Sequence, residues 1–319
     1  MRGEGTLIRR PRVTVGLPVY QGAQYIDEAI RAVRAQTYRD LELVISDNGS
    51  TDCTEAICRR HAAEDPRVSY YRSPVNRGAS WNYNRLVELA QGEYFKWASH
   101  DDVIMPEFVE RCVHFLDADP ELVLCHTGAV TIDDHGLMGR RWPPNPNAMA
   151  GPPARRFADV ALREGPCFPV FGLMRLDVLK RTGLLGPYNA HDRPLLAELA
   201  LHGRFLYIPD ILFLNRDHQQ RSIRAFKGPR DRIAWFDPSQ SGRIVFSDLR
   251  LLLEYHRAIT RVLAPGWDST RSELTLGWWT VLHARSIARE VLGGLRQLLR
   301  RAINAAIHPL GGRQSARTG

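Results

Sequence analysis

Two adjacent carboxylates, Asp101 and Asp102, follow the apolar run 93–98 and precede a helix that is expected to begin near Pro106. In open α/β sheets, ligands bind beyond the carboxyl ends of the strands, which is where such a pair would lie. Hard divalent cations that also contact phosphate oxygens prefer carboxylate ligands, so the pair predicts a site for Mg²⁺ or Mn²⁺. The alternative is that both aspartates are solvated loop residues beside a helix N-cap.

The elements that must position this pair are alternating strands and helices. Strands are expected at 13–20, 41–46, 68–72, 93–98 and 122–131, and helices at 26–33, 54–63, 80–90 and 105–117. This alternation predicts an α/β fold with a mostly parallel central sheet and helices on both faces. Later in the chain we expect an extended segment at 168–173, helices at 177–182 and 194–202, and a strand at 205–214. Residues 140–166 are rich in Pro, Gly and Arg and are predicted to form a loop.

The C-terminal part no longer alternates strands and helices, and helices are expected over 247–264, 272–292 and 295–307. In the last of these, Leu295, Leu299 and Ile303 lie on one face, while Arg296 and Arg300 lie elsewhere. A basic amphipathic helix of this kind suits a membrane interface, here the inner face of the cell membrane. The alternatives are packing against the rest of the chain or against a second subunit in a homodimer. The sequence contains no run of about 18 apolar residues, so we predict no membrane-spanning helix.

Composition narrows the classes of partner. The 319 residues are 44% hydrophobic and 24% charged, as in ordinary globular proteins. The net charge of +8 comes almost entirely from Arg and suits anionic partners such as nucleotide sugars or acidic lipid. No basic patch interleaved with aromatic residues indicates nucleic-acid binding. The five cysteines form no CxxC pair and residues 1–12 have no apolar signal core, so we expect a cytoplasmic protein.

Four motifs occur in a fixed order: 16–22 (GLPVYQG), 46–52 (SDNGSTD), 76–78 (NRG, with Asn84 after it) and 99–102 (SHDD). In this order and spacing the chain, over about residues 12–220, resembles the inverting family 2 glycosyltransferases of the GT-A fold. No G-x-G-x-x-G motif follows the first strand, which disfavours a dinucleotide-binding enzyme.

The resemblance implies a particular division of the chain. A GT-A, Rossmann-like catalytic domain would cover 1–225, with a nucleotide-sugar half at about 12–105 and an acceptor half at about 106–225. A helical C-terminal extension would cover 226–319.

The resemblance also implies a UDP- or dTDP-linked sugar as the donor. In family members, the aspartate at the place of Asp47 accepts a hydrogen bond from the imide N–H of uracil or thymine. Pro18, Val19 and Tyr20 would line the base and ribose. Arg77 would reach the base or the diphosphate, unless it is a solvated loop residue. The alternative role for Asp47 is to satisfy local backbone groups in a turn.

The family's acidic motif often reads D-x-D-D, and Ser99 occupies its first position here. The resemblance places Asp101 at the ribose and Asp102 on a Mg²⁺ or Mn²⁺ ion that bridges the diphosphate. His218 would be a further metal or diphosphate contact, although lone histidines are often structural. The cation would neutralise charge that develops on the leaving group. The site would have one acid fewer than the family motif.

The segment 190–203 resembles the family's E-D segment at the start of a helix, with His191 in place of the usual Glu. Asp192 would then be the general base that takes the proton from an acceptor hydroxyl as it attacks opposite the leaving group. His191 is the alternative base, and a plain N-cap is the alternative role for Asp192.

The acceptor is expected to be a glycan, a lipid-linked saccharide or a glycosylated small molecule. Because Ser99 and His191 replace usual acids, the alternative function is an inactive nucleotide-sugar-binding or scaffold subunit.

Overall fold

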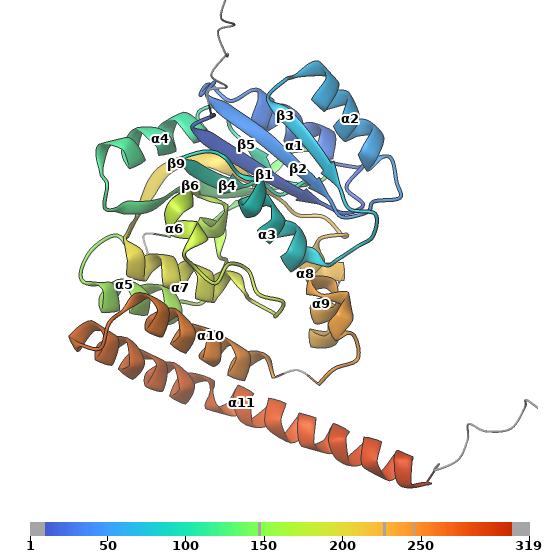
Figure 1. Ribbon diagram of the computed structural model, residues 1–319, viewed down its shortest axis with the longest axis vertical. Helices are drawn as coiled ribbons and strands as arrows, with labels where there is room; N and C mark the ends of the chain where they lie inside the picture. Colours follow the sequence, from blue (N-terminus) through green and yellow to red (C-terminus); the bar gives the residue numbers. More distant parts are fainter. Residues whose placement is uncertain (1–9, 146–147, 226–227, 245, 308–319) are drawn as a thin grey trace, which may run out of the picture.

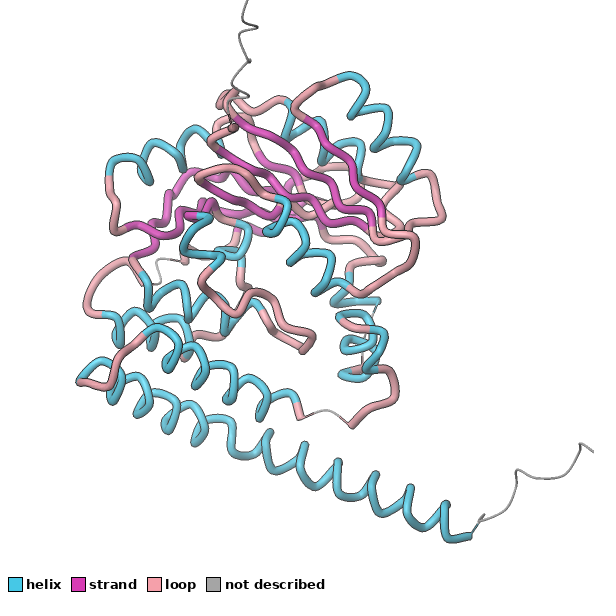
Figure 2. The backbone as a smooth tube through the Cα atoms, viewed as in Figure 1, coloured by secondary structure: helices cyan, strands magenta, loops and turns pink. Residues whose placement is uncertain are grey.

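The computed structural model describes residues 10–145, 148–225, 228–244 and 246–307. A nine-stranded sheet forms the centre, and helices surround it (Figures 1 and 2). Its strand order is β3-β2-β1-β4-β8-β6-β9-β5, and β7 pairs with β6. This α/β architecture with a helical C-terminal region confirms the predicted fold class.

The first half of the sheet is parallel. It contains β1 (Val13–Val19), β2 (Leu41–Asp47), β3 (Val68–Arg72) and β4 (Tyr94–Trp97). The connecting helices are α1 (Ile26–Arg34), α2 (Thr54–Glu64) and α3 (Ala79–Leu89). Helices α1 and α2 pack in one apolar cluster with β1, while α3 packs in a second cluster that contains Trp97. With both faces covered, β1 and β2 become near-continuous apolar runs, which made them readable in the sequence.

The second half is mixed. The long strands β6 (Leu122–Ile132) and β9 (Arg204–Arg216) pair in parallel. The short strands β5 (Val103–Ile104), β7 (Met138–Arg141) and β8 (Leu173–Arg175) pair antiparallel to their neighbours. The helices here are α4 (Phe108–Ala118), α5 (Pro153–Ala161), α6 (Leu176–Lys180) and α7 (Asp192–His202), with a 3₁₀ turn at Phe168–Phe171.

The prediction that 140–166 is a loop is wrong over α5. This helix begins with Pro153 in its first turn, a position at which proline is favoured because no amide donor is needed there. It buries Phe157 and Val160 in the core cluster shared with α7. The Pro- and Arg-rich composition concealed its short apolar face.

The C-terminal region contains α8 (Ser222–Ala225), α9 (Pro229–Phe236), a 3₁₀ turn at Pro238–Gln240, α10 (Ser247–Val262) and α11 (Trp267–Ile307). The two helices predicted at 272–292 and 295–307 are one continuous helix. Gly294 does not break it, because it lies against Phe246, where a Cβ would meet the ring at 2.6 Å. Among the described residues, no helix has the length and apolar character needed to cross a membrane.

Candidate active site

A cavity of about 690 Å³ opens at the carboxyl edge of the parallel half-sheet. Its wall comes from the loops after β1, β2 and β4, from α3, from the end of β9 and from α9. The volume is within the range of small-ligand sites. Of the residues predicted from the sequence, the cavity is lined by Pro18, Val19, Tyr20, Asp101 and His218. Asp47, Arg77, Asp102 and Asp192 are not among its lining residues.

Asp101 and His218 lie next to each other in the cavity wall. Its Oδ2 lies 2.9 Å from His218 Nε2, and its Oδ1 accepts a hydrogen bond from the Ser99 hydroxyl. Burial raises the pKa of Asp101, but the charge of His100 and the hydrogen bonds from His218 and Ser99 outweigh it, so the pKa lies below its usual range. Asp101 is thus an ionised group with both oxygens engaged.

Asp102 lies deeper than Asp101. Its Oδ1 accepts hydrogen bonds from Asn215 Nδ2 at 3.0 Å and from the backbone N–H of Arg216 at 2.8 Å. Burial and the adjacent Asp101 charge raise the pKa of Asp102. Among the described residues, the donors to Asp102 are Asn215 and Arg216, both bonded to Oδ1, which leaves Oδ2 available to a cation.

Arg216 holds this loop in place, and sequence reasoning gave it no such role. It is buried at the end of β9 and donates through Nε to the Asp101 carbonyl at 3.0 Å and through Nη1 to the Asp133 carbonyl at 2.8 Å. Its Nη2 pairs with Glu28 of α1 at 2.5 Å. An arginine at the end of a buried apolar strand was the available signal for this positioning role.

The donor set of the acidic pair limits which metal site is possible. In the part of the chain that the structure describes, no three His, Cys, Asp or Glu side chains form a group that could hold a metal ion. The protein instead offers the open Oδ2 of Asp102, with His218 nearby through Asp101. Carboxylate oxygen fits Mg²⁺ or Mn²⁺, which characteristically take their remaining ligands from water and substrate phosphates. The residues present therefore fit such a cation if the substrate supplies part of its shell.

Asp47 and Arg77 do not reach the cavity. The fully buried Asp47 carboxylate accepts hydrogen bonds from the Tyr70 hydroxyl at 2.6 Å and the Ser50 N–H at 2.8 Å, and Arg72 lies 3.5 Å away. The Arg77 guanidinium lies over the Trp81 ring at 4.3 Å and lines a neighbouring cavity of about 490 Å³. Local partners thus contact both oxygens of the Asp47 carboxylate.

Asn82 of α3 is a cavity residue that sequence reasoning missed. Its Nδ2 donates to the backbone carbonyls of Val19 and Ser46 at 3.3 and 2.9 Å, which fixes the ends of β1 and β2. Its Oδ1 is buried and has no hydrogen-bond partner, although the side chain lines the cavity. A buried acceptor without a donor is costly, so a ligand with an N–H group would satisfy it. An asparagine near the start of a helix, here the fourth residue of α3, gave no distinctive sequence signal.

Tyr83 links the acidic pair to Asp192. It lines the cavity one residue after Asn82. Burial raises the pKa of its phenol, and the charges of Asp101, Asp102 and Asp192 raise it further. The carboxylates of Asp101, Asp102 and Asp192 thus lie within electrostatic range of this hydroxyl group.

His191 is held as a structural residue. Its Nδ1 lies 2.8 Å from the Gly186 carbonyl, so Nδ1 carries the proton in the neutral ring. The ring lies 4.3 Å from that of Phe236, and burial lowers its pKa. Asp192 follows it in the first turn of α7, and neither side chain is among the residues that line the cavity.

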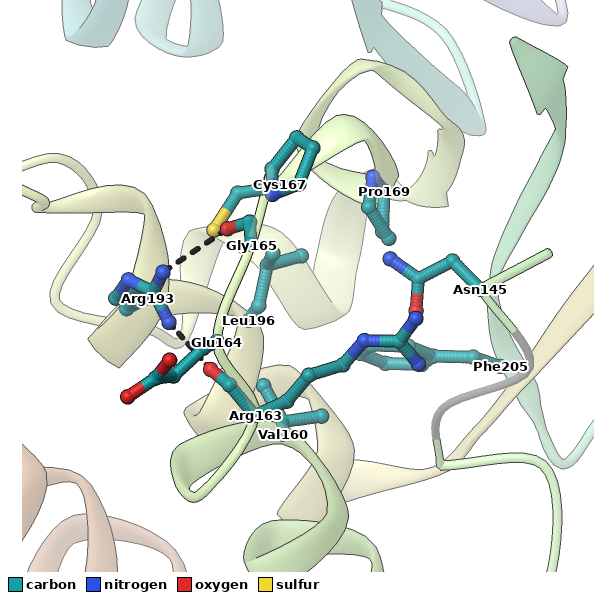
Figure 3. A pocket seen from close by; sticks show the side chains of 11 residues that line it. Asn145, Val160, Arg163, Glu164, Gly165, Cys167, Pro169, Arg193, Leu196 and Phe205 are labelled. Atoms are coloured by element: carbon teal, nitrogen blue, oxygen red, sulfur yellow. Dashed lines mark hydrogen bonds between the residues drawn. The ribbon is translucent and has the colours of Figure 1, made fainter. Parts of the chain in front are cut away.

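The surroundings of Asp192 are closely packed. Burial and the charge of Asp192 raise the pKa of the Cys167 thiol. Figure 3 shows the small pocket beside Cys167 and Arg193, where Arg193 donates to the carbonyls of Arg163 and Gly165. Its volume of about 20 Å³ has room for about one water molecule and none for a sugar ring.

The parallel half-sheet and the acidic cavity at its edge are those of a GT-A glycosyltransferase. Residues 14–183 match the family described as Glycosyl transferase family 2, and the chain belongs to this family. It is 30% identical over 223 residues to chondroitin synthase from Escherichia coli, a match that covers 67% of this chain and 32% of that protein. An uncharacterized glycosyltransferase from Rickettsia typhi is 36% identical over 124 residues, covering 39% of this chain and 38% of that protein. The matches thus span about a third of the length of these relatives.

Solved structures share the fold at low sequence identity. S. aureus TarS 1–349 in complex with UDP superposes with a TM-score of 0.61 at 16% identity, over 85% of this chain and 71% of that one. A mannosyltransferase from Pyrobaculum calidifontis in complex with GDP-Man and Mn²⁺ gives 0.50 at 18% identity, over 96% and 89%. At these identities the comparison establishes the architecture.

Proposed function

We propose that this glycosyltransferase moves a sugar from a UDP- or dTDP-linked donor to a hydroxyl acceptor with inversion. The observation that carries the proposal is the cavity at the carboxyl ends of the parallel strands, which Pro18, Tyr20 and Asp101 line. Tyr83 lines the same cavity, and the charges of Asp101, Asp102 and Asp192 contribute to raising the pKa of its phenol. This supports a site in which the acidic pair and the general-base candidate act on neighbouring groups.

In this proposal, Asn82 recognises the nucleobase of the donor. Uracil and thymine both carry an imide N–H, which is the donor that the unpartnered Asn82 Oδ1 requires. Pro18, Val19 and Tyr20 line the same cavity and supply contacts to the base and ribose. Asp47, which the sequence suggested for this role, accepts hydrogen bonds from Ser50 and Tyr70 and is not among the residues that line the cavity. The UDP complexes of TarS, a protein of the same fold, support a uridine nucleotide.

A divalent cation, Mg²⁺ or Mn²⁺, would be held by Asp102 and His218. When bound, it supplies positive charge that stabilises the departing diphosphate. Asp101 fixes the orientation of His218 through the 2.9 Å contact and is placed to bond the ribose. The Mn²⁺ in the structure of the mannosyltransferase supports this choice of metal.

Asp192 is the proposed general base. Its carboxylate would accept the proton of the acceptor hydroxyl as that oxygen attacks the anomeric carbon from the face opposite the diphosphate. The Nδ1 atom of His191 cannot act as this base, because it carries a proton that it donates to the Gly186 carbonyl. We propose a glycan, a lipid-linked saccharide or a glycosylated small molecule as acceptor.

A donor panel tests the proposal. The full chain is incubated with UDP-, dTDP- and GDP-linked sugars, with Mn²⁺ or with EDTA, and release of nucleoside diphosphate is measured. We expect turnover with UDP- or dTDP-sugars that falls at least about tenfold in EDTA, since the site needs a cation to offset the leaving-group charge. Turnover with GDP-sugars alone would overturn the assignment of uracil or thymine as the nucleobase of the donor. UDP binding without any turnover would favour an inactive nucleotide-sugar-binding subunit.

A further inference from the structure

Helix α11 presents an apolar face to solvent along its length. Trp267, Leu274, Trp278, Val281, Leu292 and Leu299 are each more than half exposed. At about 100° per residue they lie within one sector of the helix, and 41 residues span about 60 Å. The inner face is separate: Leu276 and Trp279 are buried in the core cluster that contains Tyr255 of α10. The sequence predicted an apolar stripe only within 295–307.

The charges of α11 are divided between the two faces. Arg271, Arg285, Arg289, Arg296 and Arg300 are exposed and lie within or beside the sector of the outward apolar residues, so Arg296 and Arg300 border the face of Leu299 and are not on a separate face of the helix. The three acidic residues of the helix point to neighbouring elements instead. Asp268 accepts from Ala154 N–H at 3.3 Å, Glu273 pairs with His256 at 2.8 Å, and Glu290 accepts from the N–H groups that begin α10 at 3.0 Å. The outward face therefore combines apolar side chains with positive charge alone.

We propose that the outward face of α11 lies on an anionic lipid surface. Trp and Leu side chains would enter the boundary between headgroups and acyl chains, while the arginines pair with lipid phosphates. Tryptophan is favoured at this depth because its ring is apolar and its N–H is polar. Figure 1 shows that the second half of α11 extends past α10 as one continuous helix. The outward face is therefore long and uninterrupted.

A second copy of this chain is the less suitable occupant. Pairing two outward faces would bring the five arginines of one helix against the five of the other, with no outward carboxylate on α11 to compensate them. Like charges at close range in a desolvated interface are unfavourable. An anionic surface has the complementary charge and needs no partner groove. This inference does not depend on the proposed donor or on Asp192.

Co-sedimentation with lipid vesicles tests the proposal with the full-length chain and no sugar donor. We expect the bound fraction on phosphatidylglycerol vesicles to exceed that on phosphatidylcholine by at least about tenfold at about 0.1 M salt, and to fall as salt rises. The combined variant Trp278→Gln, Leu292→Gln and Leu299→Gln should lower binding about tenfold. The combined variant Arg285→Gln, Arg289→Gln and Arg296→Gln should remove the preference for phosphatidylglycerol.

Matched controls change the same chemistry elsewhere. Leu137→Gln with Met138→Gln replaces apolar residues that are 68% and 69% exposed, and Arg31→Gln with Arg59→Gln removes surface charges. Both control proteins should bind vesicles as the wild type does, and all variants should keep the wild-type melting temperature. Absence of vesicle binding, equal binding to both lipids, or loss in the controls would overturn the proposal. So would a dimer in sedimentation equilibrium that the α11 variants dissociate while no vesicle binding occurs.

Discussion

The two halves of the sheet position their site residues in different ways. In the parallel half, the loops after β1, β2 and β4 reach the same edge, so residues just beyond a strand end meet through topology alone. In the mixed half, Asp102 meets Asn215 only because β5 pairs antiparallel with β9, and 113 residues separate the two. Cavity residues of the parallel half are therefore placed by the strand ends themselves, whereas the position of Asp102, the proposed metal ligand, depends on pairing between strands far apart in the sequence.

The largest expected effect lies in the mixed half, at Asp192. Asp192→Asn should lower transfer by about 10²–10⁴-fold, because a positioned general base contributes that much. Affinity for UDP, measured by isothermal titration with Mn²⁺, should stay within about twofold of wild type. The matched control Asp177→Asn changes an exposed carboxylate in the same half and should leave turnover unchanged. Near-wild-type turnover of Asp192→Asn would remove the residue from the mechanism.

Lys96 tests how the halves are joined. It lies on β4, its ammonium donates to the Phe171 carbonyl, and burial lowers its pKa to about 7. Because the unfolded chain binds this proton more tightly, the free energy of unfolding should rise as pH increases from about 7 to about 10.5, by an amount on the order of 5 kcal/mol. Lys96→Met should flatten that rise in urea unfolding followed across the same pH range. A wild-type stability that falls over this window would contradict the assignment.

Asp102 tests the long-range half of the metal site. Asp102→Ala should weaken Mn²⁺-dependent UDP binding about 10–100-fold, since a lost ligand or its support typically costs that much. UDP binding in EDTA should hardly change. The control Asp210→Ala removes a surface carboxylate paired with Arg111 and should leave both affinities unaltered. Equal loss with and without metal would show that Asp102 acts only through the fold.

Substitution of Asn82, which lies beside the parallel half of the sheet, is expected to change nucleotide affinity least. Wild type should bind UDP about tenfold more tightly than N3-methyl-UDP, because methylation removes the imide donor. Asn82→Ala should bring this ratio close to one, even if it also lowers stability by freeing the Val19 and Ser46 carbonyls. Asp47→Asn should keep the ratio and lower the melting temperature. The reverse pattern would return base recognition to Asp47.

The sequence predicted the parallel half well, because buried strands such as β1 and β2 are continuous apolar runs between helices of regular period. It missed β5, β7 and β8, since strands of two to four residues carry no periodicity and form only against β6, β9 or β4. The division of the chain near residue 225 stays a prediction. Asp231 and Trp235 of α9, beyond that boundary, line the cavity.

Site residues followed the same rule. Pro18 and Tyr20 reach the cavity because they lie at the end of β1, and Asp101 reaches it from the loop that follows β4. Asp47 also lies at the end of a parallel strand, but its carboxylate accepts hydrogen bonds from Tyr70 and Ser50, which only the packing of β3 against β2 reveals. Asn82 and Tyr83 lie within helix α3 and Arg216 ends β9, and at such positions a polar residue is not distinctive until its neighbours are known.

The central claim is inverting transfer in the cavity bordered by Tyr83, and the anomeric form of the first product tests it most directly. With water as the acceptor, no knowledge of the natural acceptor is needed. Proton NMR would follow the sugar released from an α-linked UDP-sugar in the presence of Mn²⁺, before mutarotation equilibrates it. Our account predicts that the β anomer appears first and that Asp192→Asn suppresses its formation. Initial release of the α anomer would contradict the account.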